Sequence, residues 1–137
     1  MTLSYQQQFV LDGLAARAAI LNLDARHNRV YSEGDLVSWI TCFRHAGASY
    51  ARGEENFTDL ATAFDGGSGQ RLVTVDHEIA VDGVSATQTC IALFFVGAEL
   101  RATGTFTDTL IYERGGWYFT ARQLNNDLVP QKDALPV

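Results

Sequence analysis

Residues 104–124, GTFTDTLIYERGGWYFTARQL, constrain the fold more than any other part of this sequence. They predict two antiparallel strands joined by a tight turn, because residues of high strand propensity flank an Arg-Gly-Gly segment. On the first strand Phe106, Leu110 and Tyr112 share one face, since successive side chains of a strand point to opposite sides. Asp108 falls on that same apolar face. A carboxylate there needs a partner or a function, so Asp108 is the first candidate site residue.

The rest of the chain changes from helical to β character along its length. We expect a long helix from a Ser4 cap to about Tyr31, a short helix after Asp35 as far as about Phe43, a short strand at residues 49–52, a third helix capped by Asn56 or Thr58, and long strands at residues 71–81, 84–96 and 99–114 before the last strand of the hairpin. Helices at one end and an antiparallel sheet at the other indicate an α+β fold.

We expect one domain over residues 1–137, with a core from about 5 to 125 and an irregular C-terminal tail at 126–137. A curved antiparallel sheet wrapped around the long N-terminal helix would form a cone with an internal apolar pocket. The outer face of the sheet would carry Ile91, Leu93, Phe95 and Ile111, which are too apolar to remain exposed to solvent. That face predicts a homodimer, or else a trimer.

Charge excludes one class of partner. The 137 residues carry a net charge of -6, from 16 acidic and 10 basic side chains, and Lys132 is the only lysine. Binding to nucleic-acid phosphates requires basic patches, which this sequence lacks. No apolar run approaches the ~20 residues that span a bilayer, so no membrane partner is expected. The start MTLSYQQQ has no signal-peptide pattern, and we expect a cytoplasmic protein.

Sequence motifs indicate neither a metal nor a cofactor. Cys42 and Cys90 stand alone, without a CxxC or Cys/His cluster, and are expected to be buried free thiols. The patterns GxSxG, GxGxxG and HExxH and the phosphate-binding P-loop are all absent from the sequence. Any chemistry must therefore come from side chains that face the core.

The long helix points two candidate side chains toward the sheet. Its apolar residues recur at helical spacing and form one stripe: Ile20, Leu23, His27, Val30 and Tyr31. Asp24 lies one turn before His27 and could orient it. Two readings stay open for His27, either a satisfied core histidine or a participant in a site.

The strands add another histidine and another tyrosine. Strict alternation along residues 71–81 places His77 on one face with four aliphatic residues: Val73, Val75, Ile79 and Val81. A histidine in such a place is either structural or a general base tuned by burial and a neighbour. Asp108 faces the same interior and is its expected partner. Tyr50 alternates inward on the short strand, where a phenol either packs or polarises a carbonyl.

In order and spacing, four segments resemble the SnoaL-like branch of the nuclear transport factor 2-like superfamily. They are the helix end YSEGD, the helix start DLVSWITCF, the strand VTVDHEIAVDG and the closing FTDTLIYERGGWYFTAR, and the resemblance covers about residues 5–125. The family has a cone-shaped α+β fold and includes scytalone dehydratase. It also contains isomerases, cyclases and the small subunits of ring-hydroxylating dioxygenases, so the fold does not choose the reaction.

The resemblance implies roles for individual residues. Tyr31 and Tyr50 correspond to the two tyrosines that hold a catalytic water near the substrate carbonyl, and His77 to the general base. Asp108 falls where the family places a polar, substrate-contacting side chain. Two departures are visible: Ser32 stands where the acid that orients the histidine is expected, and Cys90 stands near the place of a second histidine. Asp108 or Asp24 would have to replace the missing acid.

Two functions follow as expectations. The first is a cofactor-independent lyase or isomerase, of the dehydratase type, on a small apolar carbonyl or hydroxy metabolite such as a steroid, polyketide or aromatic compound. Its catalytic residues would be His77, Asp108, Tyr31 and Tyr50, and its substrate contacts His27, Asp24, Cys90 and Phe106. The second is a non-catalytic ligand-binding or assembly subunit, resembling the small subunit of ring-hydroxylating dioxygenases.

Overall fold

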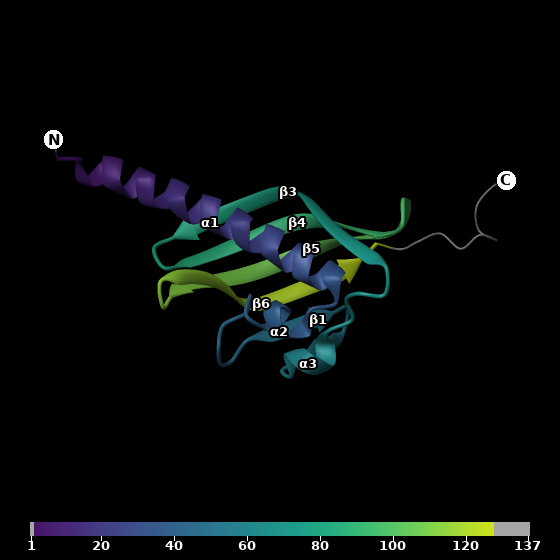
Figure 1. The fold of residues 1–137 in the computed structure, drawn as a ribbon. Coiled ribbons are helices and arrows are strands. Elements are labelled where there is room, and N and C mark those ends of the chain that lie inside the picture. Colours follow the sequence, from purple (N-terminus) through teal and green to yellow (C-terminus); the bar gives the residue numbers. More distant parts are fainter. Residues whose placement is uncertain (1, 128–137) are drawn as a thin grey trace.

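The computed structural model describes residues 2–127. Its helices are α1 (Tyr5–Glu33), α2 (Leu36–Ile40) and α3 (Leu60–Ala63), and its strands are β1 (Ser49–Arg52), β2 (Glu55–Phe57), β3 (Gln70–Asp82), β4 (Ser85–Val96), β5 (Glu99–Glu113) and β6 (Gly116–Asn126). Figure 1 shows one curved sheet with the long α1 helix lying across one side of it. The predicted α+β architecture, a curved sheet packed on a long N-terminal helix, is confirmed.

Local sequence signals fix the ends of α1. The Ser4 hydroxyl accepts from the backbone of Gln7, and the Gln7 side chain accepts from the backbone of Ser4, which completes the predicted capping box. Gly34 ends the helix in the left-handed conformation at φ 74°. A glycine suits this position because a side chain there would be strained.

The segment between the second and third helices departs from expectation. The second helix begins after Asp35 as predicted but stops at Ile40. The third helix is capped by Asp59, whose carboxylate accepts from Ala61, and not by Asn56 or Thr58. Asn56 instead lies in β2, a short strand that the polar sequence around it did not indicate.

The sheet has six strands in the order β2-β1-β6-β5-β4-β3. Neighbouring strands are antiparallel except β1, which pairs in parallel with β6. The edge strand β3 is fastened to α1 by three hydrogen bonds spread along the helix: Arg17 to the Ile79 carbonyl, Asn28 to the Thr74 hydroxyl, and the Leu72 amide to the Ser32 hydroxyl. These contacts hold α1 along the edge of the sheet and close one side of the cone.

A bulge in β3 reverses the face of half the strand. The register with β4 shifts between Val75 and Glu78, and Asp76 adopts a positive φ of 55°. After the bulge His77 faces α1, as predicted. Before the bulge the alternation is reversed, so Leu72 is buried while Val73 and Val75 lie on the outer face, which corrects the prediction for those two valines.

A second bulge lies in β6. The register with β5 shifts at Thr120, whose hydroxyl hydrogen-bonds across the irregularity to Thr109. Phe119 precedes Thr120 and Arg122 follows it, and both side chains are buried. In an unbroken strand, residues three positions apart face opposite sides of the sheet. The bulge therefore turns Arg122 into the core.

Side chains fill the middle of the cone. The largest buried side chains include aromatic residues that contact one another or His27: Tyr31, Trp39, Phe43, Tyr50, Phe106 and Phe119. A hollow of about 520 Å³ lies at the end of the sheet where β6 finishes, and its lining combines aromatic and charged side chains, among them Tyr31, Phe94, Arg52 and Asp65. Tyr112, expected to face the core, lies at the opposite end and is 45% exposed.

Three further expectations concern the whole chain. Cys42 and Cys90 are free and buried, as predicted. Within the described residues, no helix is both long and apolar enough to cross a membrane. The expected irregular tail begins at Asn126, which is still the last residue of β6, and the remainder from residue 128 lies outside the described residues.

Candidate functional site

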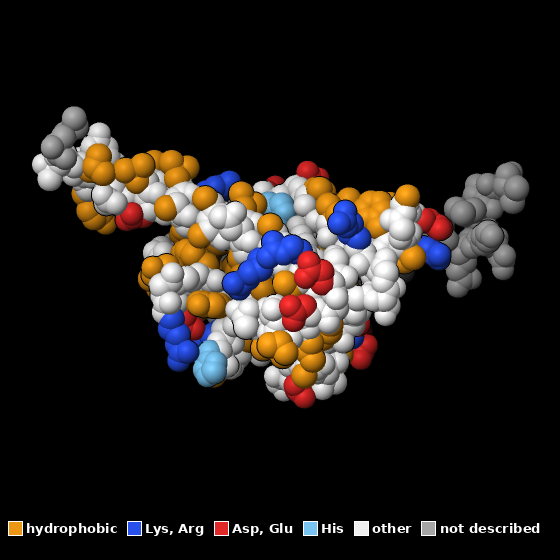
Figure 2. Space-filling model, in the orientation of Figure 1, with side chains coloured by type: hydrophobic (Ala, Val, Ile, Leu, Met, Phe, Trp, Pro, Cys, Tyr) orange, Lys and Arg blue, Asp and Glu red, His pale blue; other side chains and the backbone are white. Residues whose placement is uncertain are grey.

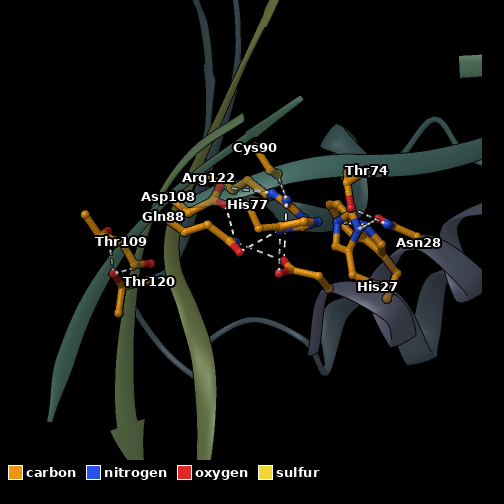
Figure 3. Close-up of polar contacts among 12 residues, drawn as sticks. His27, Asn28, Thr74, His77, Gln88, Cys90, Asp108, Thr109, Thr120 and Arg122 are labelled. Atoms are coloured by element: carbon orange, nitrogen blue, oxygen red, sulfur yellow. Dashed lines mark hydrogen bonds and ion pairs between the residues drawn. The ribbon is translucent and has the colours of Figure 1, made fainter. Parts of the chain in front are cut away.

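Five polar side chains from five different elements converge inside the sheet: Asp24 from α1, His77 from β3, Gln88 from β4, Asp108 from β5 and Arg122 from β6. Figure 3 labels four of them: His77, Gln88, Asp108 and Arg122. All are buried to within 2% exposure apart from His77, whose side chain is 15% exposed. His77 is thus the member of the cluster that a substrate could reach.

Gln88 fixes which nitrogen of His77 carries a hydrogen. The Gln88 amide nitrogen donates to Asp24 Oδ1 and to Asp108 Oδ2, each at 2.9 Å. Both amide hydrogens are then in use, so the Gln88 oxygen must accept from His77 Nδ1, 2.9 Å away. Nδ1 therefore carries a hydrogen, and Nε2 is the ring atom that can exchange a proton.

Asp24 is the carboxylate closest to His77. Its Oδ2 atom lies 3.2 Å from His77 Nδ1, at ion-pair distance. Asp108, the partner expected from the sequence, does not contact the histidine and is connected to it through Gln88. The expectation that Asp24 orients His27 is not met either, because Asp24 faces His77, Gln88 and Arg122.

Arg122 supplies the positive charge behind the two carboxylates. Its Nε lies 3.0 Å from Asp108 Oδ1, and its Nη2 lies 3.8 Å from Asp24 Oδ1. The guanidinium group stacks 3.7 Å from the centre of the Phe106 ring, and Nη2 donates to Cys90 Sγ at 3.7 Å. Phe106 and Cys90, both expected to contact substrate, thus contact Arg122 and are almost completely buried.

The surroundings shift the proton affinities of the cluster. The Asp24 carboxylate, with smaller contributions from Cys90 and Gln88, raises the pKa of His77 to about 11. Burial raises the pKa of Asp108 to about 6, although Arg122 and Gln88 oppose that shift. Burial also works against the charge of Arg122, but Asp108 and Asp24 outweigh it and raise its pKa. Arg122 and a protonated His77 thus lie next to the carboxyl groups of Asp24 and Asp108.

His27 belongs to a separate, structural arrangement. The Trp39 indole donates to His27 Nε2 at 2.9 Å, so Nδ1 carries the hydrogen and donates to Asn28 Oδ1 at 3.2 Å. The ring is fully buried and stacks on Tyr31. Burial lowers its pKa well below the ordinary value, which keeps the ring neutral. Both nitrogens are in use, which matches the first of the two readings of His27.

The two candidate tyrosines have other partners. The Tyr31 hydroxyl donates to Asp65 Oδ1 at 2.9 Å and borders the hollow at the end of the sheet. Tyr50 is buried between Trp39 and Phe43. Burial raises the pKa of both phenols, that of Tyr50 to about 12, so both remain protonated donors at neutral pH.

Although a serine and not an acid follows Tyr31, His77 still has a carboxylate partner. Ser32, at that position, donates to the Asn28 carbonyl and accepts from the Leu72 amide, which ties the helix to β3. The acid comes from Asp24, two turns earlier on the same helix. Compared with the family pattern, the acid beside the histidine is therefore present but comes from another position of the helix, Asp24.

Gln88 and Arg122 are the two members of the cluster that the sequence reasoning missed. Gln88 alternates with Ala86, Cys90 and Ala92, all buried, and this spacing could have indicated that it faces inward. Arg122 gave no such signal, because strict alternation from Phe119 places it outside. Among the described residues, no group of three or more His, Cys, Asp or Glu side chains is arranged to hold a metal ion.

Solved structures share this architecture at low sequence identity. An NTF2-like protein with a cystatin-like fold from Novosphingobium aromaticivorans superposes with a TM-score of 0.79 at 19% identity, over 98% of this chain and 96% of its own. A candidate scytalone dehydratase from the same organism gives 0.74 at 15% identity, over 85% and 87%. The beta subunit of a candidate aromatic-ring-hydroxylating dioxygenase, also from that organism, gives 0.70 at 14% identity, over 93% and 99%.

These likenesses establish the fold and leave the reaction open. No curated protein matches the sequence. The model of the SnoaL-like domain family matches residues 12–123, which include all five members of the buried cluster. This protein therefore belongs to the SnoaL-like domain family, within the NTF2-like fold.

Proposed function

We propose that this protein is a cofactor-independent lyase or isomerase that acts on a small, mostly apolar carbonyl or hydroxy compound. The observation that carries the proposal is the contact of 3.2 Å between His77 Nδ1 and Asp24 Oδ2, within a cluster of otherwise buried charges. A histidine that is held by a carboxylate and remains partly exposed is an arrangement that acid–base catalysis can use.

The raised pKa of His77 sets the order of the proton transfers. Because Asp24 raises this pKa to about 11, the resting ring carries protons on both nitrogens at neutral pH. His77 would first donate the Nε2 proton to a carbonyl or leaving hydroxyl oxygen of the substrate. The neutral ring would then remove a proton from the adjacent carbon. In a dehydration the protonated hydroxyl leaves as water, and the ring ends the cycle protonated. In an isomerisation the ring gives the proton taken from carbon to the far carbon of the enol and recovers the proton from its oxygen, so it again ends protonated.

The remaining candidates would support this step. Tyr31 and Tyr50 would stabilise the developing oxyanion as protonated donors. For Tyr31 this would require its hydroxyl to exchange the hydrogen bond to Asp65 for one to the substrate. Asp108 would hold Gln88 and Arg122 in place and so act on His77 indirectly. The substrate would be a small apolar compound such as a steroid, polyketide or aromatic ketone.

Deuterium exchange tests the proposal without knowledge of the natural substrate. The protein is incubated in D₂O with a panel of apolar cyclic ketones and β-hydroxy ketones, and mass spectrometry follows deuterium uptake and loss of water. We expect His77→Gln and Asp24→Asn to slow any observed conversion at least about 100-fold. His45→Gln removes an exposed histidine and is the matched control. Full activity of His77→Gln would exclude this mechanism.

A second candidate function is a non-catalytic assembly subunit. It is favoured by the packing of Gln88, Asp108 and Arg122, each about 1% exposed, which leaves little open space beside the charges. The fold shared with a dioxygenase beta subunit is compatible with it. This candidate predicts that no compound of the panel is converted or raises the unfolding temperature, and that His77→Gln changes stability alone.

A further inference from the structure

The first part of α1 projects beyond the sheet without covering anything. We call residues 3–14 the overhang. Buried residues of α1 begin at Ala16, while large apolar side chains before that point are between 46% and 85% exposed: Leu3, Tyr5, Phe9, Val10, Leu11 and Leu14. Figure 2 shows them as an apolar arm on the left, and Figure 1 shows that no strand lies beneath the end of this helix.

The overhang needs a cover for two physical reasons. A helix of about twelve residues with no tertiary contacts is marginal in water. Apolar side chains are also distributed around this segment, so it has no fully polar face to present to solvent. The end of β6 does not provide the cover, since Asn126 lines the hollow beside Tyr31 at the far end of the helix.

The outer face of the sheet offers a complementary surface. Cross-strand pairs Val73–Leu93 and Val75–Ile91, with Phe95 beside them, form an apolar corner on the side of the sheet away from α1. We call these five residues the outer corner. Val75 is 37% exposed and the others are partly exposed, and no element of the described chain covers them. A bare helix and a bare sheet face are surfaces that normally pack together.

We propose that the overhang of one copy packs across the outer corner of a second copy, so that a two-fold dimer contains this contact twice. The area suits a stable dimer. Half-exposed large side chains contribute roughly 100 Å² each, and one sheet face can cover about half of those on the overhang, so this patch buries roughly 300 Å². Each copy of a two-fold dimer buries its overhang and its outer corner, and the two patches with their polar flanks approach the ~800 Å² per partner of a standard interface. Each copy supplies the element that the other lacks.

Charge favours this occupant over a membrane. The overhang contains no lysine or arginine, and Asp12 is its single charged residue. An amphipathic helix that binds anionic lipid carries basic residues on its polar face. Arg71 lies on the same face of β3 as the outer corner and is exposed, which gives Asp12 an oppositely charged neighbour in the proposed dimer.

Sedimentation equilibrium tests the contact from both sides. We expect the wild-type chain to be a dimer, and Phe9→Gln/Leu14→Gln to raise its dissociation constant at least about 100-fold. Val75→Thr/Ile91→Thr, which keeps strand propensity, should have a similar effect. Val37→Ser removes an apolar side chain that is 77% exposed on α2 and should leave the dimer intact. Circular dichroism checks that each variant is folded.

A cross-link then tests the geometry. Leu14→Cys and Val75→Cys chains are mixed and oxidised, with the native Cys42 and Cys90 buried. A disulfide between the two different chains supports the contact. A monomeric wild type overturns the proposal, as does a dimer that survives the overhang substitutions or one that depends on the overhang alone. Binding of the wild type to phosphatidylcholine–phosphatidylglycerol vesicles, abolished by Phe9→Gln/Leu14→Gln, would assign the overhang to a membrane instead.

Discussion

His77 Nδ1 lies 3.2 Å from Asp24 Oδ2, and the two residues come from the edge strand and from the helix fastened along it. His77 carries the ring that can exchange a proton, and it is the one member of the cluster that remains partly exposed. Most of what can be tested about this protein follows from how that pair holds its proton.

Replacing Asp24 should release the proton of His77. In Asp24→Asn the largest contribution to the raised pKa is gone, so the pKa should fall from about 11 toward the ordinary 6.5. Two-dimensional NMR of ¹⁵N-labelled histidine measures this directly, and the exposed His45 provides an internal reference. A His77 that still titrates near 11 in Asp24→Asn would mean that another group holds its charge.

The same pair predicts how stability depends on pH. The folded pKa of His77 is raised, so its contribution is complete below about 6.5 and is lost as pH rises toward 11. The difference in unfolding free energy between wild type and His77→Gln should therefore shrink between pH 6.5 and pH 10. Urea unfolding at several pH values measures it. A difference that grows over that range would contradict a raised pKa.

Gln88 should hold the Nδ1 proton of His77 and stabilise the cluster. Gln88→Met removes the donor to both carboxylates and the acceptor for His77 Nδ1, so unfolding should be easier by about 2–4 kcal/mol. Gln88→Glu retains an acceptor but brings a third carboxylate. It should therefore keep the hydrogen bond of the Nδ1 proton, read from its ¹H and ¹⁵N shifts, while losing stability. An unchanged Nδ1–H signal in Gln88→Met would show that Asp24 alone accepts from the ring.

Replacing Arg122 should leave the buried carboxylate of Asp108 without a positively charged partner. We expect Arg122→Met to lower the unfolding free energy by about 3–5 kcal/mol, because Asp108 loses its cation. Adding Asp108→Asn should recover about 1–3 kcal/mol of that loss, since the uncompensated charge disappears. If the double variant is less stable than Arg122→Met, the charge of Asp108 is not the source of the cost.

The pH dependence of the unfolding free energy should also distinguish Arg122→Met from the double variant Arg122→Met/Asp108→Asn. The pKa of Asp108 is raised to about 6, so its protonated form is favoured by folding and stability falls as pH rises through 6. In Arg122→Met this fall should extend to higher pH, because the cation that opposed the shift is gone. The variant that also carries Asp108→Asn should lack it.

His27 should behave as a structural residue throughout. His27→Phe removes the acceptor of the Trp39 indole and should cost about 1–3 kcal/mol of stability. The pKa of His77 should stay unchanged, since the two histidines belong to separate hydrogen-bond arrangements. Loss of catalytic conversion in a His27→Phe protein that remains folded would place His27 in the site after all.

Sequence reasoning succeeded where a local pattern carries the information. The Ser4 capping box and Gly34 set the ends of α1, and alternation on β5 placed Asp108 inside. It failed where register changes. The bulge at Asp76 moved Val73 and Val75 to the outer face, and the bulge at Thr120 turned Arg122 inward. One extra residue in a strand reverses every side chain beyond it, and no periodic pattern announces where it falls.

The amino-acid sequence alone predicts the order of the helices and of every strand except β2, the lone carboxylate on an apolar face and the inward histidine, because spacing along one element sets the side that a residue faces. The contact of Asp24 with His77, the link from Asp24 to Asp108 through Gln88 and the pairing of Arg122 with Asp108 arise only in the folded protein. Those contacts join five elements, and their distances depend on how α1 lies along β3 and on two bulges. Packing across elements sets such distances, and spacing within one element cannot.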